Sequence, residues 1–428
     1  MPPSSPLETD DRNWAGNYRY SAARRHHPRS LEQVRELVSS AESLKALGSR
    51  HSFNPIADTR ADQLSLGFLN RVLELDPERR TVTVEGGIRY GELCRYLDRE
   101  GYALPNLASL PHISIAGACA TATHGAGERN GNLATAVSAL ELVDARGALM
   151  GLRQGELDGA FEGAVVGLGA LGVVTKLTLN IVPAFMVRQW VYEELAHTEL
   201  EAHFDEIQAR GYSVSLFTDW RSPWINQVWV KQLVREPHSE EPPTPLFSAK
   251  LATTHLHPIK VMSAANCTEQ LGIPGPWHER LPHFRMDHTP SSGDELQSEY
   301  FVPRRHGVEA LRRISALASE LAPLLQISEV RTIAADRLWM SPCYHQPSVA
   351  IHFTWRPVWA AVRELLPKLE ERLDELEVRP HWGKLFTMEP AKVAARYERL
   401  QDFRALVSRY DPHGKFRNDF VDRYVFGR

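Results

Sequence analysis

The sequence predicts an α+β protein, without the regular strand–helix alternation of a doubly wound parallel sheet. Short helical and strand patterns follow one another irregularly through residues 1–180, and several further strand patterns come after Pro183. A Gly-rich hexapeptide with the spacing of a dinucleotide fingerprint is followed by a strand pattern rather than a helix. At about 100–200 residues per domain, the 428 residues correspond to two or three domains.

The composition is that of a soluble globular protein, with 43% apolar and 24% charged residues. A net charge of −4 gives no electrostatic reason to bind nucleic acid or anionic membranes. Residues 1–11 lack the regions of a signal peptide, and no apolar run approaches the roughly 20 residues of a membrane span. Because the cysteines are far apart and form no Cys-x-x-Cys, we expect no metal site, no disulfide and a reducing cytoplasm around Cys94, Cys119, Cys267 and Cys343.

The first half of the chain carries clear start and stop signals. Ser30 and Gln33 have the spacing of a capping box, and the helix that follows turns one apolar face inward through Leu31, Val34, Leu37 and Val38. A second helix is predicted at Tyr90–Glu100, ended by Gly101. Strands are predicted on both sides of two turns, at Val72–Leu75, Thr81–Glu85, Ala139–Val143 and Ala148–Leu152.

Residues 167–172, Gly-Leu-Gly-Ala-Leu-Gly, spell the dinucleotide fingerprint. That fingerprint needs a strand before it and a helix after it. Here Val173–Leu179 follows, alternating and β-branched, which indicates a strand. We therefore reject a Rossmann site at this position.

The region after Pro183 contains predicted strands, one helix and an exposed loop. The helix is expected at Thr198–Arg210 with Thr198 as its N-cap. Residues 236–245 are rich in Pro and Glu and are expected to form an exposed loop. The strands are Val187–Tyr192, Val214–Thr218 and Gln227–Val230, and four tryptophans are expected to be packing residues, namely Trp220, Trp224, Trp229 and Trp277.

Two Gly-rich stretches are candidates for ligand binding. Residues 48–53, Gly-Ser-Arg-His-Ser-Phe, place His51 after an apolar step, where Gly48 permits a sharp turn. Residues 111–127 have almost no bulky side chain after Ile115. Such a run fills a core poorly but lets main-chain N–H groups approach a pyrophosphate. Taken alone, His51 is better explained as a histidine in a surface loop, and the second Gly-rich stretch is what favours a ligand site.

In this order and spacing, the two stretches resemble the vanillyl-alcohol-oxidase superfamily of FAD enzymes. In the branch that this chain resembles, the histidine of Gly-Ser-X-His-Ser is bonded covalently to the flavin. Four further segments resemble the alditol oxidase (xylitol oxidase) family, at residues 13–17, 218–221, 266–270 and 381–384. Arg50 departs from this pattern, because many relatives carry Gly there. A positive φ at Arg50 would add strain.

The resemblance implies an α+β fold with a two-subdomain FAD-binding domain of the vanillyl-alcohol-oxidase (PCMH) type and a mixed α/β cap over the flavin. It divides the chain into a flexible tail at 1–12, the FAD-binding domain at 13–185, a cap at 186–372 and a C-terminal return at 373–428. Residues 411–418 fit that return. The hexapeptide at 167–172 is then expected close to the adenine half of FAD.

Candidate substrate residues lie on late strand patterns. Alternation places Glu329, Arg331 and Ile333 on one strand face, where a carboxylate and a guanidinium can bracket two hydroxyls. Thr354 repeats the pattern on the next strand. A partly desolvated Lys384 near Arg331 would have a lowered pKa. Spacing alone favours a surface ion pair for Glu329 and Arg331, and a surface lysine for Lys384.

The resemblance assigns roles to these positions. Ser109, Glu329 and Thr354 are implied to hold polyol hydroxyls, and Arg331 and Lys384 to contact the reacting terminal hydroxyl as catalytic residues. His381 is implied to lie near the flavin. The implied FAD contacts are His51 as the covalent link, with Gly48, Ser49, Arg50, Ser52, Phe53, Ser109, Ser114, Gly117, Ala118, Thr121, Thr123, His124, Gly125, Val173, Val174 and His381.

The expected function is oxidation of the terminal primary alcohol of alditols such as xylitol or sorbitol to the aldose, with oxygen reduced to hydrogen peroxide. The expected partners are a small polyol and molecular oxygen, for a chain expected to be monomeric. An aldonolactone oxidoreductase is the nearest enzyme alternative. A flavin-loaded binding or storage protein is another, and retention of five polar site residues argues against it.

Overall fold

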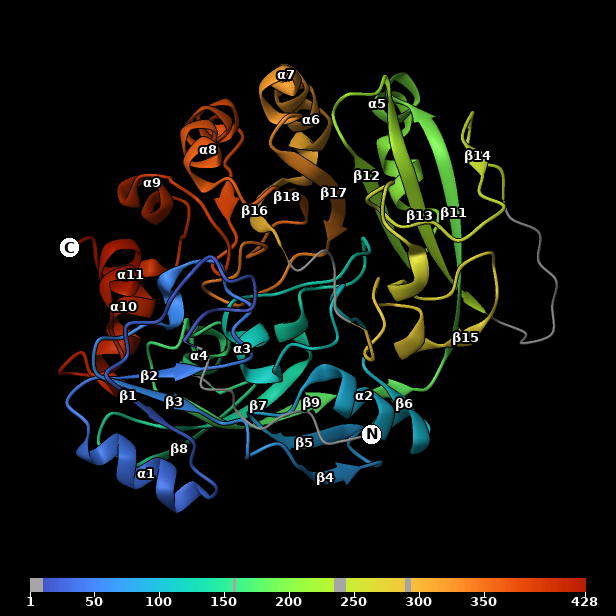
Figure 1. Ribbon diagram of the computed structural model, residues 1–428. Coiled ribbons are helices and arrows are strands. Elements are labelled where there is room, and N and C mark those ends of the chain that lie inside the picture. Colours follow the sequence, from blue (N-terminus) through green and yellow to red (C-terminus); the bar gives the residue numbers. More distant parts are fainter. Residues whose placement is uncertain (1–10, 157–158, 235–243, 289–293) are drawn as a thin grey trace.

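The computed structural model describes residues 11–156, 159–234, 244–288 and 294–428. Its two large sheets are antiparallel and occupy opposite halves of the molecule, with loops meeting between them (Figure 1). The only parallel pairing in the described ranges that joins named strands is a three-stranded sheet, in the order β1-β3-β2. The prediction of an α+β fold without a doubly wound parallel sheet is confirmed.

The lower half of Figure 1 holds the smaller sheets. The parallel sheet consists of β1 (Arg24–His26), β3 (Asp62–Ser65) and β2 (Leu44–Leu47). The five-stranded sheet has the order β4 (Val72–Asp76), β5 (Thr81–Glu85), β9 (Val173–Asn180), β7 (Val137–Val143) and β8 (Leu149–Arg153). A third pair joins β6 (Tyr102–Ala103) and β10 (Val182–Pro183). The strands predicted before Pro183 are thereby confirmed.

Two helices of the lower half begin or end at the cap and stop residues predicted from the sequence. Ser30 caps α1 (Leu31–Ser40) by accepting a hydrogen bond from Gln33 N, and Gly101 at φ 80° ends α2 (Tyr90–Arg99). The capping box is incomplete, because the Gln33 side chain accepts from Arg29 N instead of Ser30 N. Two shorter helices, α3 (Ile115–Ala120) and α4 (Ala160–Val165), lie above the five-stranded sheet in Figure 1. Since α4 precedes the 167–172 turn and β9 follows it, rejecting a Rossmann site was correct.

A nine-stranded antiparallel sheet forms the upper half, and helices α5 to α8 cover its outer side (Figure 1). In sheet order its strands are β14 (Lys250–Leu251), β11 (Met186–Ala196), β13 (Trp224–Val234), β12 (Ser213–Thr218), β17 (Leu325–Ile333), β18 (Ser348–Trp355), β16 (Leu296–Pro303) and β19 (Arg379–Pro380), with β15 (Gly275–Pro276) paired to β11. The helices are α5 (His197–Gln208), α6 (Gly307–Ser315), α7 (Ala318–Leu321) and α8 (Trp359–Asp374). The strands predicted between Pro183 and Val230 are confirmed within longer ones.

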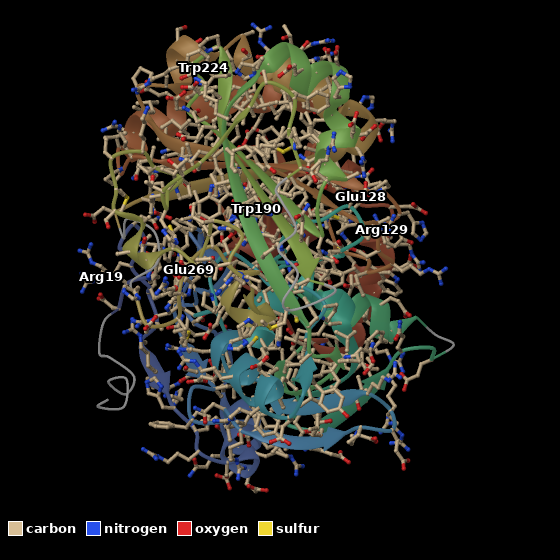
Figure 2. The ribbon with its side chains drawn as sticks, turned by 90° about the vertical axis from the view of Figure 1, so that its right-hand side faces the viewer. Arg19, Glu128, Arg129, Trp190, Trp224 and Glu269 are labelled. Carbon is tan, nitrogen blue, oxygen red and sulfur yellow. The ribbon has the colours of Figure 1, made fainter. Side chains whose placement is uncertain are left out.

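Three details of this half differ from expectation or lie outside the described residues. Thr198 is inside α5, and the N-cap is Ala196, because β11 runs directly into the helix. Trp224, which was predicted to be a packing residue, is 37% exposed at the outer end of β13. Figure 2 shows it above Trp190, which lies midway along β11. Trp220, Trp229 and Trp277 are buried as predicted. Most of the predicted loop at 236–245 lies outside the described residues, and Thr244 and Pro245 are exposed.

The C-terminal segment returns to the lower half through α9 (Pro390–Ala395), α10 (Leu400–Tyr410), α11 (Asp419–Val421) and a last turn at Asp422–Phe426 (Figure 1). Leu44 N donates to Lys415 O, and the buried Lys45 donates to Phe416 O. Asn418 Nδ2 donates to the carbonyls of Pro55, Ile56 and Asp58. In the residues with assigned structure, no helix combines the length and apolarity needed to cross a bilayer.

Candidate active site

A cavity of about 570 Å³ is lined by loops of the lower half and by strands of the nine-stranded sheet. It brings together nearly all of the residues predicted from the sequence. Those that line it are Gly48, Ser49, Arg50, His51, Ser52, Phe53, Ser109, Ser114, Gly117, Ala118, Thr121, Thr123, His124, Val174, Glu329, Arg331, Thr354, His381 and Lys384. Gly125 and Val173 are placed beside the cavity rather than on its surface.

Glycines let the lower-half loops approach one another closely. A Cβ on Gly48 would lie 2.8 Å from Ser114 Oγ, and one on Gly117 would lie 2.9 Å from the same atom. Gly48 has no positive φ, so its glycine is explained by this approach and not by the sharp turn that the sequence predicted. Gly125 also serves packing, because a Cβ there would lie 2.2 Å from Leu107 O.

His51 is held at this wall as a neutral ring. Burial lowers its pKa to about 3, and His112 acts in the same direction. Its Nδ1 lies 2.8 Å from Ser49 O, its Nε2 has no hydrogen-bond partner among the described residues, and Trp14 stacks on the ring at 5.4 Å between centroids. Arg50 has a φ of 63°, so the strain expected from a positive φ is present beside His51.

The opposite wall is built around the buried carboxylate of Glu299 on β16. Lys384 Nζ donates to Glu299 Oε2 at 2.6 Å, and Arg331 Nη2 donates to Oε1 at 2.8 Å. His124 Nε2 lies 3.2 Å from Oε1. Although burial opposes its charge, these neighbours, Lys384 first, hold the pKa of Glu299 well below its ordinary value. One carboxylate therefore positions both predicted catalytic cations.

Glu329 provides a second carboxylate on strand β17, which is separated from β16 by β18. Its Oε1 lies 3.4 Å from Arg331 Nε and 2.8 Å from His283 Nε2. Burial acts against the charged form, but Arg331 and then His283 hold the pKa of Glu329 below its ordinary value. Arg331 Nη1 also donates to Ser109 Oγ at 3.3 Å. Arg331 thus lies between the two carboxylates and contacts the Ser109 loop.

Sheet register brings the third strand into the site. His352 on β18 pairs with Glu299 on one side and with Glu329 on the other, and Thr354 follows on the same strand face. Burial, and next Lys384, lower the pKa of His352 to about 3. Its Nε2 has no hydrogen-bond partner in the described part of the chain. His352 is therefore a neutral imidazole at the wall of the cavity.

Lys384 comes from a loop that the lower half holds in place. Asn54 Nδ2 donates to Trp382 O and to Lys384 O, each at 2.8 Å. Phe53 N donates to Gly383 O at 2.8 Å. Burial lowers the pKa of Lys384 and Glu299 opposes that shift, in the direction predicted from the sequence. Phe53 and Asn54 of the lower half therefore fix the loop from which Lys384 reaches Glu299 on the nine-stranded sheet.

Sequence reasoning missed Glu299, His352, His283 and their neighbour Lys231. Glu299 lies in a strand that is buried on both faces, and its partners Arg331, Lys384 and His124 come from distant segments, so no local pattern indicated it. His352 shares a strand face with Thr354, so the alternation that indicated Thr354 would have found it. Lys231 and His283 contact each other across unrelated segments, and no local pattern indicates them.

The lower wall fits FAD. A dinucleotide needs a large cavity, close main-chain approach and polar partners, and the cavity offers each of these. Ser114 Oγ and His51 Nε2 are buried polar atoms that have no hydrogen-bond partner in the described ranges, and both residues line the cavity. The glycines at 48 and 117 keep the wall free of side chains beside them.

Comparisons with known proteins agree with this site. The FAD binding domain family matches residues 23–153, and the D-arabinono-1,4-lactone oxidase family matches residues 293–424. Alditol oxidase of Streptomyces sp. (strain IKD472 / FERM P-14339) is 50% identical over 97% of this chain and 99% of its own length. L-gulonolactone oxidase of Bos taurus is 27% identical, covering 97% of this chain and 98% of its own.

Cholesterol oxidase from Brevibacterium sterolicum has the same fold, with a TM-score of 0.78, 15% identity and 99% coverage of both chains. This likeness confirms the predicted fold of the vanillyl-alcohol-oxidase type. Half of all residues are shared with the Streptomyces enzyme along almost the whole chain. The chain therefore belongs to the alditol oxidase family of FAD-dependent oxidases.

Proposed function

We propose that this protein oxidises the terminal primary alcohol of alditols such as xylitol and sorbitol to the aldose, with oxygen reduced to hydrogen peroxide. The observation that carries the proposal is the wall on which Arg331 and Lys384 share the buried carboxylate of Glu299. A linear polyol offers only hydroxyls, so its site needs several converging polar groups. The 50% identity to an alditol oxidase supports the same conclusion.

Each polar residue has a role that follows from its place. Lys384 and Arg331 hold positive charge where the reacting hydroxyl loses its proton, and this favours the alkoxide-like form. His352, neutral and with Nε2 unpartnered in the described residues, can accept a hydrogen bond from a substrate hydroxyl. Ser109, Glu329 and Thr354 hold the remaining hydroxyls and so set which carbon reacts. Bound FAD would supply the hydride acceptor and the route for two electrons to oxygen.

We further propose that His51 holds FAD covalently. Its neutral ring keeps a nitrogen lone pair free for bonding to carbon, and Trp14 and Ser49 O fix the ring's orientation. Acid precipitation should leave yellow colour in the protein pellet. Flavin found entirely in the supernatant would contradict covalent attachment. His51→Ala should still bind some FAD non-covalently, because the 114–124 wall remains.

The finer organisation is also part of our proposal. The start of the nine-stranded sheet at Met186 supports a boundary between an FAD-binding domain at 13–185 and a cap at 186–372, with 373–428 returning to the first. A cavity wall assembled within one chain supports a monomer. Four buried, free cysteines support a reducing compartment such as the cytoplasm.

The test is a visible spectrum of purified protein under nitrogen, with substrates added one at a time. Xylitol or sorbitol should bleach the flavin absorbance, and admission of air should restore it with formation of hydrogen peroxide. The match to the lactone oxidase family at 293–424 makes an aldonolactone the comparison compound. Bleaching by the aldonolactone but by no polyol would show that the alternative function is correct.

A further inference from the structure

A chain of buried polar contacts extends from the substrate wall into the sheet, away from the cations around Glu299. Lys231 on β13 donates from Nζ to Pro282 O at 3.0 Å and to Leu281 O, and its Nζ lies 3.2 Å from His283 Nδ1. His283 Nε2 in turn lies 2.8 Å from Glu329 Oε1. Lys231, His283 and Glu329 are at most 5% exposed.

These contacts define the tautomer of His283. Nδ1 faces an ammonium group, which only donates, so Nδ1 must be the accepting nitrogen. Nε2 then carries the proton and donates it to the Glu329 carboxylate. The other tautomer would place an N–H against the ammonium of Lys231 and a lone pair against the carboxylate, and both contacts would be repulsive. Burial and Lys231 lower the pKa of His283 to about 4, so the ring is neutral near pH 7.

The surroundings hold His283 firmly. Phe217 and Trp229 meet its ring edge-on, with centroids 5.5 and 5.2 Å away. Thr268 N donates to His283 O, and Thr268 Oγ1 donates to Pro282 O at 2.7 Å. This explains a motif whose purpose the sequence left open, because the 266–270 segment holds the main chain on which His283 stands.

We propose that Lys231 and His283 are positioning residues for substrate selection: Lys231 fixes the donating tautomer of His283, which keeps Glu329 ionised and oriented to accept a hydrogen bond from a substrate hydroxyl remote from the reacting carbon. The proposal rests on the proposed polyol oxidation. Arg331 contacts Glu329 through Nε and Glu299 through Nη2, and Lys384 is bound to Glu299, so Glu329 and Lys384 are joined only through Arg331 and Glu299.

The experiment compares two substrates in anaerobic stopped-flow reduction of the FAD-loaded full-length enzyme. Xylitol has hydroxyls along its whole length, whereas 1,2-propanediol has none beyond its second carbon. Lys231→Met keeps the side-chain length and removes the donor. It should weaken the apparent Kd for xylitol about tenfold or more, the scale of one hydrogen bond to a charged group, and change that for 1,2-propanediol less than about twofold.

Two further variants separate positioning from loss of structure. In the Lys231→Met background, His283→Gln supplies an amide donor that needs no tautomer control, and it should restore most of the preference for xylitol. Val230→Ala loosens the neighbouring buried position of the same strand without touching His283, and the ratio of the two Kd values should stay unchanged. If Lys231→Met does not fold, single His283→Gln and His283→Leu variants replace it, with the preference kept by Gln and lost by Leu.

A pH series gives an independent readout. Burial lowers the pKa of Lys231 to about 7, Glu329 and Cys267 oppose that shift, and Arg331 and Arg280 reinforce it. The charged form is present below this pKa, so the wild-type preference for xylitol should fall as pH rises through about 7. Taking the ratio of the two substrates cancels the titration of Lys384, which acts on both. In Lys231→Met this step should be absent.

The possible results are distinct. Equal weakening for both substrates, an unchanged ratio, or no rescue by His283→Gln would overturn the positioning role. Wild-type enzyme that xylitol does not reduce would instead contradict the proposed function.

Discussion

The two walls of the cavity are built in opposite ways. In the lower wall, at residues 48–53 and 114–124, Gly48, Ser114 and Gly117 meet at contacts too tight for a Cβ on either glycine. The upper wall presents Glu299, Glu329, Arg331 and Lys384, charged side chains that are buried against one another. The lower wall therefore depends on the absence of side chains at its glycines, and the upper wall depends on the pairing of its buried charges.

This difference predicts how each wall fails. Adding atoms should disturb the lower wall and affect how the cofactor is held. Removing one charge should disturb the upper wall, because the remaining partner is left buried without compensation. The comparison holds if added atoms change cofactor content alone and removed charges change stability or the reduction rate alone. A variant of one wall that has the effect expected of the other would contradict it.

The largest effect is expected from Glu299→Gln. It removes the carboxylate shared by Lys384 and Arg331, and breaking a buried pair in this way costs about 3–5 kcal/mol. The free energy of unfolding, measured by denaturant titration at pH 7, should fall by that amount. A loss of less than about 1 kcal/mol would mean that solvent compensates the two cations.

Acid should remove the same contribution in the unmodified protein. The folded pKa of Glu299 is lower than its unfolded value of about 4.3, so its stabilisation is present above that value. It is lost as pH falls from about 4.3 towards the folded pKa. Glu299→Gln should therefore show a smaller loss of stability between pH 5 and pH 3. Parallel curves for both proteins would contradict this.

Lys384→Met should lower the rate constant for flavin reduction by xylitol about a hundredfold or more, equivalent to about 2.7–4 kcal/mol. The lysine stabilises charge that grows as the hydroxyl proton leaves, so its effect is greater in the transition state than in the bound complex. Anaerobic stopped-flow at saturating xylitol measures it. The flavin content should not change, because the lower wall is intact. An unchanged rate would leave Lys384 without a role in the transition state.

Gly117→Ala tests the lower wall. The added Cβ would lie 2.9 Å from Ser114 Oγ, and overpacking of this kind costs about 1–3 kcal/mol. We expect less FAD in the purified protein but an unchanged reduction rate per bound flavin. Gly151→Ala is the matched control, because no atom lies within 4 Å of its added Cβ. A slower rate with full flavin content would show that the two walls are not separable.

Arg50→Gly should give the smallest effect, a gain in stability of up to about 1 kcal/mol. Glycine relieves the strain of φ 63°, and its greater freedom in the unfolded chain offsets part of the gain. Thermal unfolding measures the change. Arg80→Gly, at φ 52° in the turn between β4 and β5, is the control far from His51. A lower Tm for Arg50→Gly alone would show that the arginine contributes to the loop.

Local patterns predicted most of the fold. Helix α1, helix α2 and the paired strands before Pro183 follow from apolar spacing and Gly or Pro stops. The predicted cap at Thr198 was wrong because β11 runs directly into α5, so the cap position falls on Ala196, whose side chain cannot accept a hydrogen bond. A periodic sequence pattern depends only on residues that are close together in the chain, so it does not show how one element joins the next.

The candidate site divides in the same way. Residues within one motif, such as Gly48 to Phe53, or on one strand face, such as Glu329 and Arg331, were accessible from sequence. Glu299 and Lys231 were not, because their importance depends on pairings between distant strands. A register shift of one residue would turn Glu299 to the other face of its sheet.

The clamp that Asn54 places on the carbonyls of Trp382 and Lys384 has a consequence for synthesis of the chain. The flavin loop emerges from the ribosome early, and the segment that carries Lys384 emerges near the end. Until then Asn54 Nδ2 has neither of these carbonyls to bind. The carbonyls of Pro55 and Asp58 likewise lack the hydrogen bonds that Asn418 Nδ2 donates. A chain that ends before residue 382 therefore lacks both the carbonyl partners of Asn54 Nδ2 and the segment that carries Lys384.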